Sequence, residues 1–272
     1  MTASSQTAQT EVQSPAATAE AFVSARLAAR ATPDYPGVLP VTMDDGYVIQ
    51  EIAIGLYPDP IIGWKVGGVP PPRQEALGTH RLAGPIFARN RWPIDGDVSV
   101  AAIEGGFTAV EAEFLARIGP DVDPSKTVWT AEEAADAVDA VFIGLEIAGS
   151  PLSAINDLGP PIVVSDFGNN AGIFVGPELT DWRSVLDGVE VETVIDGVSV
   201  GTGGSPSLQG GAIESVRFLL EHCAKRGRPL TQGMLVSTGA VTGVHRVYAG
   251  SEFTCDFRGV GLIKGKVVKA EA

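Results

Sequence analysis

The sequence predicts a mixed α/β fold of the α+β type, in which a small N-terminal helical region precedes a β-rich domain. Two capped helical patterns lie before residue 60, and short apolar runs with strand periodicity dominate the rest. The 33 glycines and 19 prolines indicate many turns rather than a helical bundle. A chain of 272 residues can bury a sizeable core. We therefore expect a disordered segment at 1–15, a helical region at 16–60 and a β-rich domain at 61–272.

The composition excludes several classes of function. A net charge of −14 disfavours nucleic acid and anionic membranes as partners, because both repel an acidic surface. The two cysteines, Cys223 and Cys255, form no C-x-x-C pair, which argues against zinc ribbons and thioredoxin-type sites. The first residues lack the basic start and apolar core of a signal peptide, and no apolar run is long enough to span a membrane. We expect a cytoplasmic protein.

The helical region begins after a polar segment. Ser14 and Pro15 are typical of an N-cap and a first helical position, and they predict a helix over residues 16–31. A second helix is predicted to begin at Thr42, where Asp45 takes the place of the usual Glu in a capping box. The expected apolar face of this second helix consists of Val48, Ile49, Ile52 and Leu56.

Residues 61–69 read as a buried strand that ends in a glycine turn. The strand carries one charge, Lys65. A lysine in such a place can be an edge residue whose amine reaches solvent, or it can be a functional buried amine. The sequence alone leaves both alternatives open.

The segment from Phe107 to Ala116 holds two carboxylates in an apolar run. Because side chains alternate along a strand, Glu111 and Glu113 point to the same face there, whereas in a helix they would diverge. Two carboxylates this close repel each other, and burial increases the repulsion. A divalent cation would relieve it. The alternative is an edge strand with two solvated glutamates.

A third carboxylate occurs on the next predicted strand. A capping box at Thr130 and Glu133 predicts a helix through residue 139, and residues 140–149 then read as a strand with Glu146 in an apolar setting. Such a glutamate most often has a Lys or Arg partner, and here it is also the obvious third ligand. An all-carboxylate site suits Mg²⁺, Mn²⁺ or Ca²⁺ better than Zn²⁺.

The remaining elements are predicted from turns and periodicity. Residues 161–175 are expected to form strand, turn and strand, with the turn at 165–170. Residues 181–200 are expected to form short strands with a hairpin at Asp196-Gly197, and residues 201–211 a glycine-rich lead-in to a helix. That helix spans 212–225, presents Val216, Leu219, Leu220 and Cys223, and ends before Gly227. Residues 234–268 are expected to be β-rich.

Nucleophile-elbow and H-E-x-x-H motifs are absent from the sequence, and the three histidines are scattered. His222 falls on a predicted helix and His245 in a predicted turn. His80, just before the predicted metal strands, is the candidate for a role in a site.

Together these segments resemble the hydratase and decarboxylase branch of the fumarylacetoacetate hydrolase superfamily, which includes 2-keto-4-pentenoate hydratases and 4-oxalocrotonate decarboxylases. The resemblance runs from about residue 40 to 265 and combines an upstream G-x-K-x-G with E-x-E and a later L-E. The matching stretches are Tyr47-Val48-Ile49-Gln50, Gly63-Trp64-Lys65-Val66-Gly67, Gly84-Pro85-Ile86-Phe87-Ala88, Val110-Glu111-Ala112-Glu113 and Gly144-Leu145-Glu146-Ile147-Ala148-Gly149-Ser150, followed by the chain after Gly211.

The resemblance implies a β-roll catalytic domain, a homo-oligomer and a site for Mg²⁺ (or Mn²⁺) held by Glu111, Glu113 and Glu146. It implies that the metal chelates a small 2-oxo or 2-hydroxy acid through its C1 and C2 oxygens. Lys65 matches a lysine that assists proton transfer, and desolvation is expected to lower its pKa toward neutrality. Lys65, Ser165 and Thr238 are expected to contact the substrate.

One position departs from the pattern of the family. Hydratases and decarboxylases of this type carry an acidic residue two positions before the glycine of the G-x-[LI]-F-A stretch, and Leu82 stands there instead. The turn at Ser165-Asp166 differs as well. His80 and Asp166 are therefore candidate catalytic replacements for the missing acid.

The resulting expectation is a metal-dependent hydratase (a lyase) of aromatic catabolism that acts on a 2-hydroxy-dienoate or a 2-oxo-enoate. The alternatives are a C–C bond-cleaving acylpyruvate hydrolase or 2-oxo acid decarboxylase of the same superfamily, and a diverged, non-catalytic keto-acid-binding member.

Overall fold

The computed structural model describes residues 14–271 and confirms the mixed α/β class. Nearly all of the segment predicted to be disordered, 1–15, lies outside the described residues. Helix α1 (Pro15–Leu27) begins as predicted, because the Ser14 hydroxyl accepts a hydrogen bond from the Ala17 amide. It ends earlier than predicted, at Leu27 rather than at residue 31. Helix α2 (Met43–Leu56) begins with the predicted capping box of Thr42 and Asp45.

Two β-sheets form most of the remaining chain. The larger sheet has the strand order β2-β1-β10-β5-β6-β7-β3, with β11 paired to β5. Its strands are β1 (Ile61–Gly68), β2 (Arg81–Phe87), β3 (Arg91–Pro93), β5 (Phe107–Ile118), β6 (Val138–Ser150), β7 (Asn170–Glu178), β10 (Leu235–Ser237) and β11 (His245–Arg246). The smaller sheet has the order β4-β13-β12-β8-β9 and consists of β4 (Val98–Ala102), β8 (Val191–Ile195), β9 (Val198–Gly203), β12 (Glu252–Phe257) and β13 (Gly261–Lys269).

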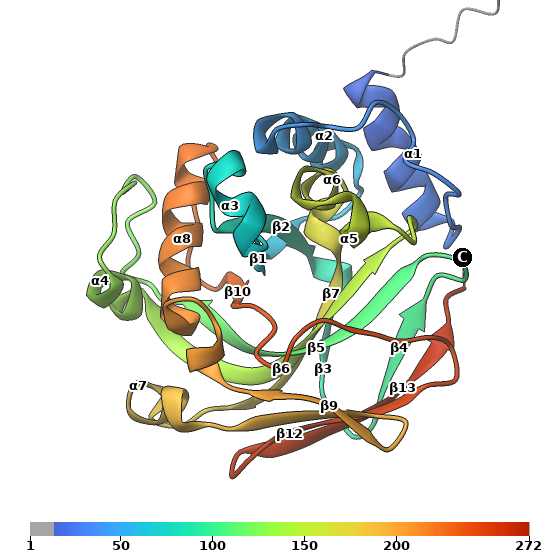
Figure 1. The fold of residues 1–272 in the computed structure, drawn as a ribbon. Coiled ribbons are helices and arrows are strands. Elements are labelled where there is room, and N and C mark those ends of the chain that lie inside the picture. The colour runs from blue at the N-terminus through green and yellow to red at the C-terminus, as the bar shows by residue number, and fades with distance from the viewer. Residues whose placement is uncertain (1–13, 272) are drawn as a thin grey trace, which may run out of the picture.

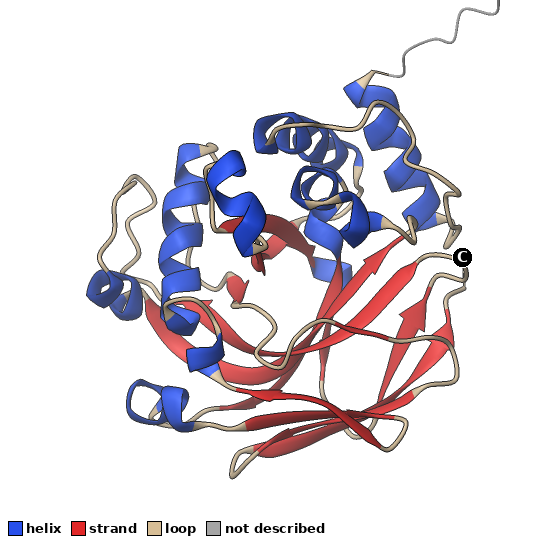
Figure 2. Cartoon of the chain, in the orientation of Figure 1, coloured by secondary structure: helices blue, strands red, loops and turns tan. Residues whose placement is uncertain are grey.

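The sheets and helices form layers (Figure 1). The smaller sheet lies below the curved larger sheet, and most helices gather above the larger one, as the blue and red segments of Figure 2 show. Besides α1 and α2, the helices are α3 (Pro71–Leu77), α4 (Ala131–Asp136), α5 (Ile155–Leu158), α6 (Pro160–Ser165), α7 (Trp182–Val185) and α8 (Gly211–Lys225). Among the described residues, no helix combines the length and the apolar character that crossing a membrane requires.

The two faces of strand β5 differ: one faces the apolar core, and the other holds the two glutamates. Phe114 of β5 packs edge-on against Phe257 of β12, with ring centroids 5.7 Å apart, so the even-numbered residues of β5 face the smaller sheet. The odd-numbered residues, which include Glu111 and Glu113, therefore face the helical side. This alternation puts an apolar core between the sheets and leaves the carboxylates on the other face.

The predicted apolar face of α2 is wrong in part. Val48 and Leu56 are 52% and 48% exposed, whereas Tyr47 and Gln50 are buried. The Gln50 side-chain amide donates to the carbonyls of Ala83 on β2 and Val164 on α6. A pattern based on hydrophobicity misses a buried glutamine that is stabilised by hydrogen bonds. These hydrogen bonds join α2 to elements of the later segment. The predicted boundary between a helical region at 16–60 and a β-rich domain at 61–272 therefore stays a prediction.

The segment predicted as the first strand of 161–175 is also wrong, because it forms helix α6. Ile162, Val163 and Val164 favour a strand by propensity. Pro160 and Pro161, however, occupy the first helical positions, where a missing N–H costs nothing and the fixed φ suits a helix. Helix α7 likewise replaces part of the predicted strands of 181–200, and α3 was not predicted.

Helix α4 begins as predicted but ends at Asp136 rather than at residue 139, because β6 already begins at Val138. Several other local predictions are confirmed. The hairpin between β8 and β9 turns at Asp196 and Gly197, whose φ angles are +50° and +80°. Helix α8 buries the predicted face, and Gly227 follows it with a φ of +74°. The tail is β-rich, and Gly243, Gly250 and Gly259 all have positive φ in its turns.

His222 of α8 occupies an apolar environment. Its ring stacks on Phe218, with centroids 5.0 Å apart, and lies 4.8 Å from the ring of Tyr47. Its Nε2 atom is buried and has no hydrogen-bond partner among the described residues. Burial, reinforced by the nearby Arg226 and Lys225, lowers the pKa of His222 to about 4.

This pKa predicts a loss of stability in acid. An unfolded histidine takes up a proton near about pH 6.5, whereas folded His222 resists protonation until about pH 4, so stability falls as the pH drops through this window. We expect urea unfolding of His222→Phe and His222→Gln to show a smaller loss between pH 7 and pH 5 than the wild type. Equal losses in the wild type and both variants would contradict this.

Candidate metal centre and cavity

Two neighbouring strands bring three glutamates together. Glu111 and Glu113 are separated by one residue on β5, and Glu111 is directly opposite Glu146 on β6. Each of the three offers one carboxylate oxygen that lies within 4.8 Å of the others. Glu113 and Glu146 have no exposed surface, and Glu111 is 4% exposed. The alternative of an edge strand with two solvated glutamates is wrong.

The surrounding hydrogen bonds leave one oxygen of two buried carboxylates, Glu113 and Glu146, unpaired among the described residues. Glu113 Oε2 accepts from Ser237 Oγ (2.6 Å) and from the Gly239 amide (2.8 Å). Glu146 Oε1 accepts from Asn170 Nδ2 (3.0 Å) and lies 3.1 Å from Lys65 Nζ. Glu113 Oε1 and Glu146 Oε2 are buried without a partner among the described residues. Buried oxygens of this kind are costly unless something else binds them.

The charges of the cluster are unbalanced. Burial, and then repulsion from Glu146, raise the pKa of Glu111 to about 8, and the same causes raise the pKa of Glu113 well above its ordinary value. Three carboxylates would carry three negative charges against the single positive charge of Lys65. The donor set therefore fits a hard divalent cation such as Mg²⁺, Mn²⁺ or Ca²⁺, which binds carboxylate oxygens and would supply the missing positive charge.

Lys65 lies beside this cluster, on β1, and only 5% of the residue is exposed. The amine is thus a buried group, not an edge residue that reaches solvent. Burial acts to lower the pKa of Lys65, but the three carboxylates, Glu146 foremost, outweigh it and raise the pKa. The expected shift toward neutrality is therefore wrong for the site without a cation, because the neighbouring negative charges stabilise the ammonium.

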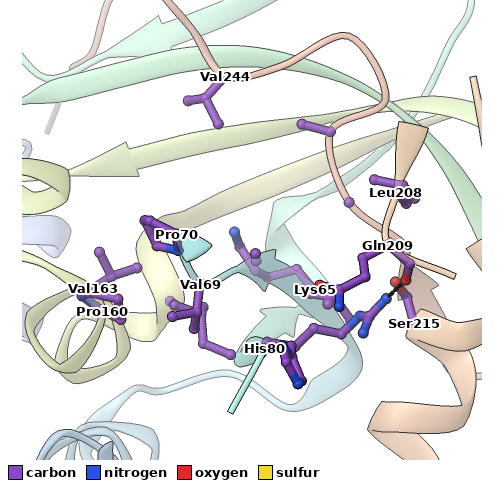
Figure 3. Close-up of a pocket in the computed structure, with 18 of the residues that line it drawn as sticks. Lys65, Val69, Pro70, His80, Pro160, Val163, Leu208, Gln209, Ser215 and Val244 are labelled. Atoms are coloured by element: carbon purple, nitrogen blue, oxygen red, sulfur yellow. Dashed lines mark hydrogen bonds between the residues drawn. The ribbon is translucent and has the colours of Figure 1, made fainter. Parts of the chain in front are cut away.

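A cavity of about 580 Å³ opens next to the cluster (Figure 3). Lys65, Glu111 and Thr238 line it at the cluster, and His80, which precedes β2, and Leu82 of β2 line it as well. Val69, Pro70, Pro160 and Val163 form one side of the view, and Lys65, Gln209 and Ser215 lie on the other. A small molecule in this cavity would contact the carboxylate cluster at one end.

The sequence of the chain is similar to those of two curated enzymes. No protein-family model matches the chain. It is 25% identical over 231 residues to the 2-keto-4-pentenoate hydratase of Paraburkholderia xenovorans (strain LB400), which covers 82% of this chain and 83% of that relative. The 2-keto-4-pentenoate hydratase 3 of Pseudomonas putida matches equally.

The fold is also similar to those of solved structures. The 4-oxalocrotonate decarboxylase from Pseudomonas putida G7, complexed with magnesium and adipate, superposes with a TM-score of 0.77 at 20% identity, covering 93% of this chain and 97% of that one. The fumarylpyruvate hydrolase from Pseudomonas aeruginosa, in complex with Mn²⁺ and pyruvate, gives a TM-score of 0.56 at 16% identity, covering 78% and 91%. The chain has the fumarylacetoacetate hydrolase fold. This confirms the resemblance found in the sequence, and together the similarities support an enzyme of this superfamily.

Two residues named on the strength of the fumarylacetoacetate hydrolase resemblance do not reach the cavity. Both carboxylate oxygens of Asp166 are bound, one by Arg26 Nε of α1 (2.5 Å) and the other by Ser150 Oγ (2.6 Å). The Ser165 hydroxyl donates to the Ile162 carbonyl and accepts from Tyr35. Because α6 forms where a strand was predicted, it turns both side chains toward the N-terminal helical region.

The other named residues do line the cavity. His80 lies at its wall with Nδ1 2.6 Å from Gln74 Oε1. Thr238 is buried, and its hydroxyl donates to the Phe114 carbonyl at 2.9 Å. Leu82 lies near the Lys65 amine, since a Cβ placed on Gly67 would lie 2.9 Å from Leu82 Cδ1 and 3.6 Å from Lys65 Nζ. The position of the family acid is thus occupied by an aliphatic side chain.

The residues that orient the carboxylates were missed from the sequence. Ser237 and Gly239 come from β10 and the loop after it, which are distant from β5 in sequence but adjacent to it in the sheet. Asn170 begins β7, and its own carbonyl accepts from Arg26 Nη1 (2.9 Å) while its side chain donates to Glu146. A polar pair, Asn169-Asn170, at the start of an apolar strand was the one available signal.

The cluster predicts a distinct stability response to metal. Glu113→Gln keeps the shape and removes a buried charge, so we expect the metal-free variant to melt no lower than the metal-free wild type. Mn²⁺ should raise the melting temperature of the wild type but not that of the variant, because binding stabilises only a protein that holds the ion. Glu190→Gln, an exposed carboxylate change, serves as the control and should respond like the wild type. A full Mn²⁺ response of Glu113→Gln would contradict the site.

Proposed function

We propose that the protein is a divalent-metal-dependent lyase that acts on a 2-hydroxy-dienoate or 2-oxo-enoate, with hydration as its reaction. The observation that carries the proposal is the convergence of Glu111, Glu113 and Glu146, with two unpaired buried oxygens, beside Lys65 and a cavity. The names of the two curated relatives support hydration as the reaction. Mg²⁺ or Mn²⁺ is the proposed cofactor, and the cytoplasmic location and homo-oligomeric state stay predictions.

The residues divide the work as follows. Glu111, Glu113 and Glu146 would hold the cation, which supplies Lewis acidity for the negative charge that develops on an enolate. Ser237, the Gly239 amide and Asn170 fix the orientation of two of these carboxylates through the bonds described above. Lys65 is placed to hold a proton at the cavity wall and to transfer it to or from the substrate carbon.

A second candidate reaction, decarboxylation, is favoured by one observation. Hydration needs a group that activates water, and Glu111 is the single carboxylate among the described residues that line the cavity. Leu82 stands where the family carries an acid, and the carboxylates beside the Lys65 amine are the three of the cluster, so water activation would fall to His80 or to a cation-bound water. Release of CO₂ from a 2-oxo acid needs charge stabilisation and one proton but no activated water.

Product analysis separates these alternatives. With a 2-hydroxy-dienoate and Mg²⁺, a hydratase gives a product heavier by one water, whereas a decarboxylase acting on an unsaturated 2-oxo dicarboxylate releases CO₂. Treatment with EDTA should abolish either reaction, and oxalate should compete with the substrate. Binding of oxalate with no turnover of any substrate would favour a non-catalytic keto-acid-binding protein instead.

Lys65→Met tests the proposed proton transfer. The methionine keeps much of the side-chain volume and removes the amine, and general acid–base catalysis typically contributes about 10²–10⁴-fold. Because Leu82 cannot share the proton transfer, we expect turnover to fall near the upper end of that range, about 10⁴-fold. Mn²⁺ affinity, measured by calorimetry, should be largely kept. Near-normal turnover would give Lys65 a structural role.

A further inference from the structure

The part of the cavity away from the carboxylate cluster carries positive charge. Apart from Lys65 and Glu111 at the cluster, the titratable groups that line it are Arg73, His80 and Arg81, and none of the described lining residues adds a further Asp or Glu. The whole protein carries a net charge of −14. A cationic wall in so acidic a protein indicates that the cavity selects for negative charge.

Arg81 is the buried arginine at this wall. It is the first residue of β2 and only 9% exposed. Its guanidinium donates to the carbonyl of Gln209, another lining residue, and no carboxylate of the described residues lies within 4.0 Å of it. A guanidinium has five donors in a planar fork, so most of its hydrogen-bonding capacity is left for another acceptor.

The carboxylate that acts on the charge of Arg81 leaves its hydrogen-bonding capacity unsatisfied. Glu214 of α8 is within electrostatic range, but its carboxylate already accepts two hydrogen bonds from Arg217, at 2.7 Å and 2.6 Å. Burial is the largest influence on the pKa of Arg81 and lowers it, so Glu214 does not offset the loss of solvation. A buried, charged and incompletely paired arginine beside a cavity is stabilised when an anion binds there.

The position of Arg81 suits a ligand that also reaches the carboxylate cluster. On the β1–β2 pair, Lys65 lies opposite Gly84, and Arg81 is three residues farther along β2. Three residues of strand span about 10 Å. A short carbon chain, together with the reach of the arginine side chain, can bridge this interval. Leu82 and Val69 contribute apolar surface along the same wall.

We propose that Arg81 binds a second anionic group of the substrate, so that the preferred substrates are 2-oxo acids with a carboxylate at the far end. This inference rests on the proposed function, because it assumes that the 2-oxo acid end binds at the cluster. Arg81 is then a specificity-determining residue. In the rival interpretation Arg81 only ties the segment around Gln209 to β2.

Matched ligands test the proposal by binding alone. In calorimetry with Mg²⁺, 2-oxoadipate and 2-oxohexanoate share the chelating end and the chain length and differ in the terminal carboxylate. We expect the wild type to bind 2-oxoadipate at least about tenfold more tightly, as one charged hydrogen-bonding partner provides. Arg81→Met should abolish this preference and leave the affinity for oxalate unchanged. Arg81→Lys, which keeps the charge without the fork, should keep part of it.

The control is Arg258→Met, which removes the same charge from an exposed surface position, and it should bind all three ligands like the wild type. Equal binding of the two six-carbon ligands by the wild type would overturn the proposal, as would a preference that survives in Arg81→Met. A uniform loss for all ligands in Arg81→Met would indicate the structural tie. If oxalate fails to bind the wild type with Mg²⁺, the proposed function fails, and the result is distinguishable from failure of the arginine subsite.

Discussion

The burial of three carboxylates around one lysine is the constraint on which the rest of this structure depends. Ionised carboxylates are rarely taken out of water without compensation. Here the strand register of β5 and β6 places Glu111 and Glu146 opposite each other, and Lys65 supplies only one positive charge. The hydrogen bonds to Glu113 and Glu146 satisfy one oxygen of each and leave the second free. Such an arrangement fits a site for a further cation.

Different residues around the cluster hold the carboxylates in place and line the cavity. Arg26 of α1 binds Asp166 and the backbone carbonyl of Asn170, and Asn170 in turn holds Glu146. The N-terminal helical region therefore supports the centre through Asn170. On the cavity side, Leu82 replaces an acid and Arg81 adds a positive charge to the wall. The aliphatic residue replaces a family acid, and the arginine beside it is the basis of the proposed anion subsite.

The sequence was sufficient for features governed by local rules. Strand alternation predicted that Glu111 and Glu113 share a face, and caps and turns predicted the starts of α1, α2 and α4 and the hairpin at Asp196. It failed where tertiary packing decides. Gln50 is buried by hydrogen bonds to distant carbonyls, and Asp166 pairs with Arg26, which is remote in sequence. Helix α6 is a different case, because Pro160 and Pro161 were a local helix signal that the strand propensity of the following residues concealed. The proposed role of Arg81 could not be predicted from the sequence, because it depends on the cavity and on the pairing of Glu214 with Arg217.

The central claim is that these three carboxylates hold one divalent cation to which a 2-oxo acid binds. The most direct measurement is a crystal structure of the protein with Mn²⁺ and oxalate, with the ion located by its anomalous scattering. We expect a single Mn²⁺ at about 2.0–2.6 Å from an oxygen of each of Glu111, Glu113 and Glu146, with oxalate completing the coordination from the cavity. An empty cluster at saturating Mn²⁺, or Mn²⁺ and oxalate bound elsewhere, would contradict it.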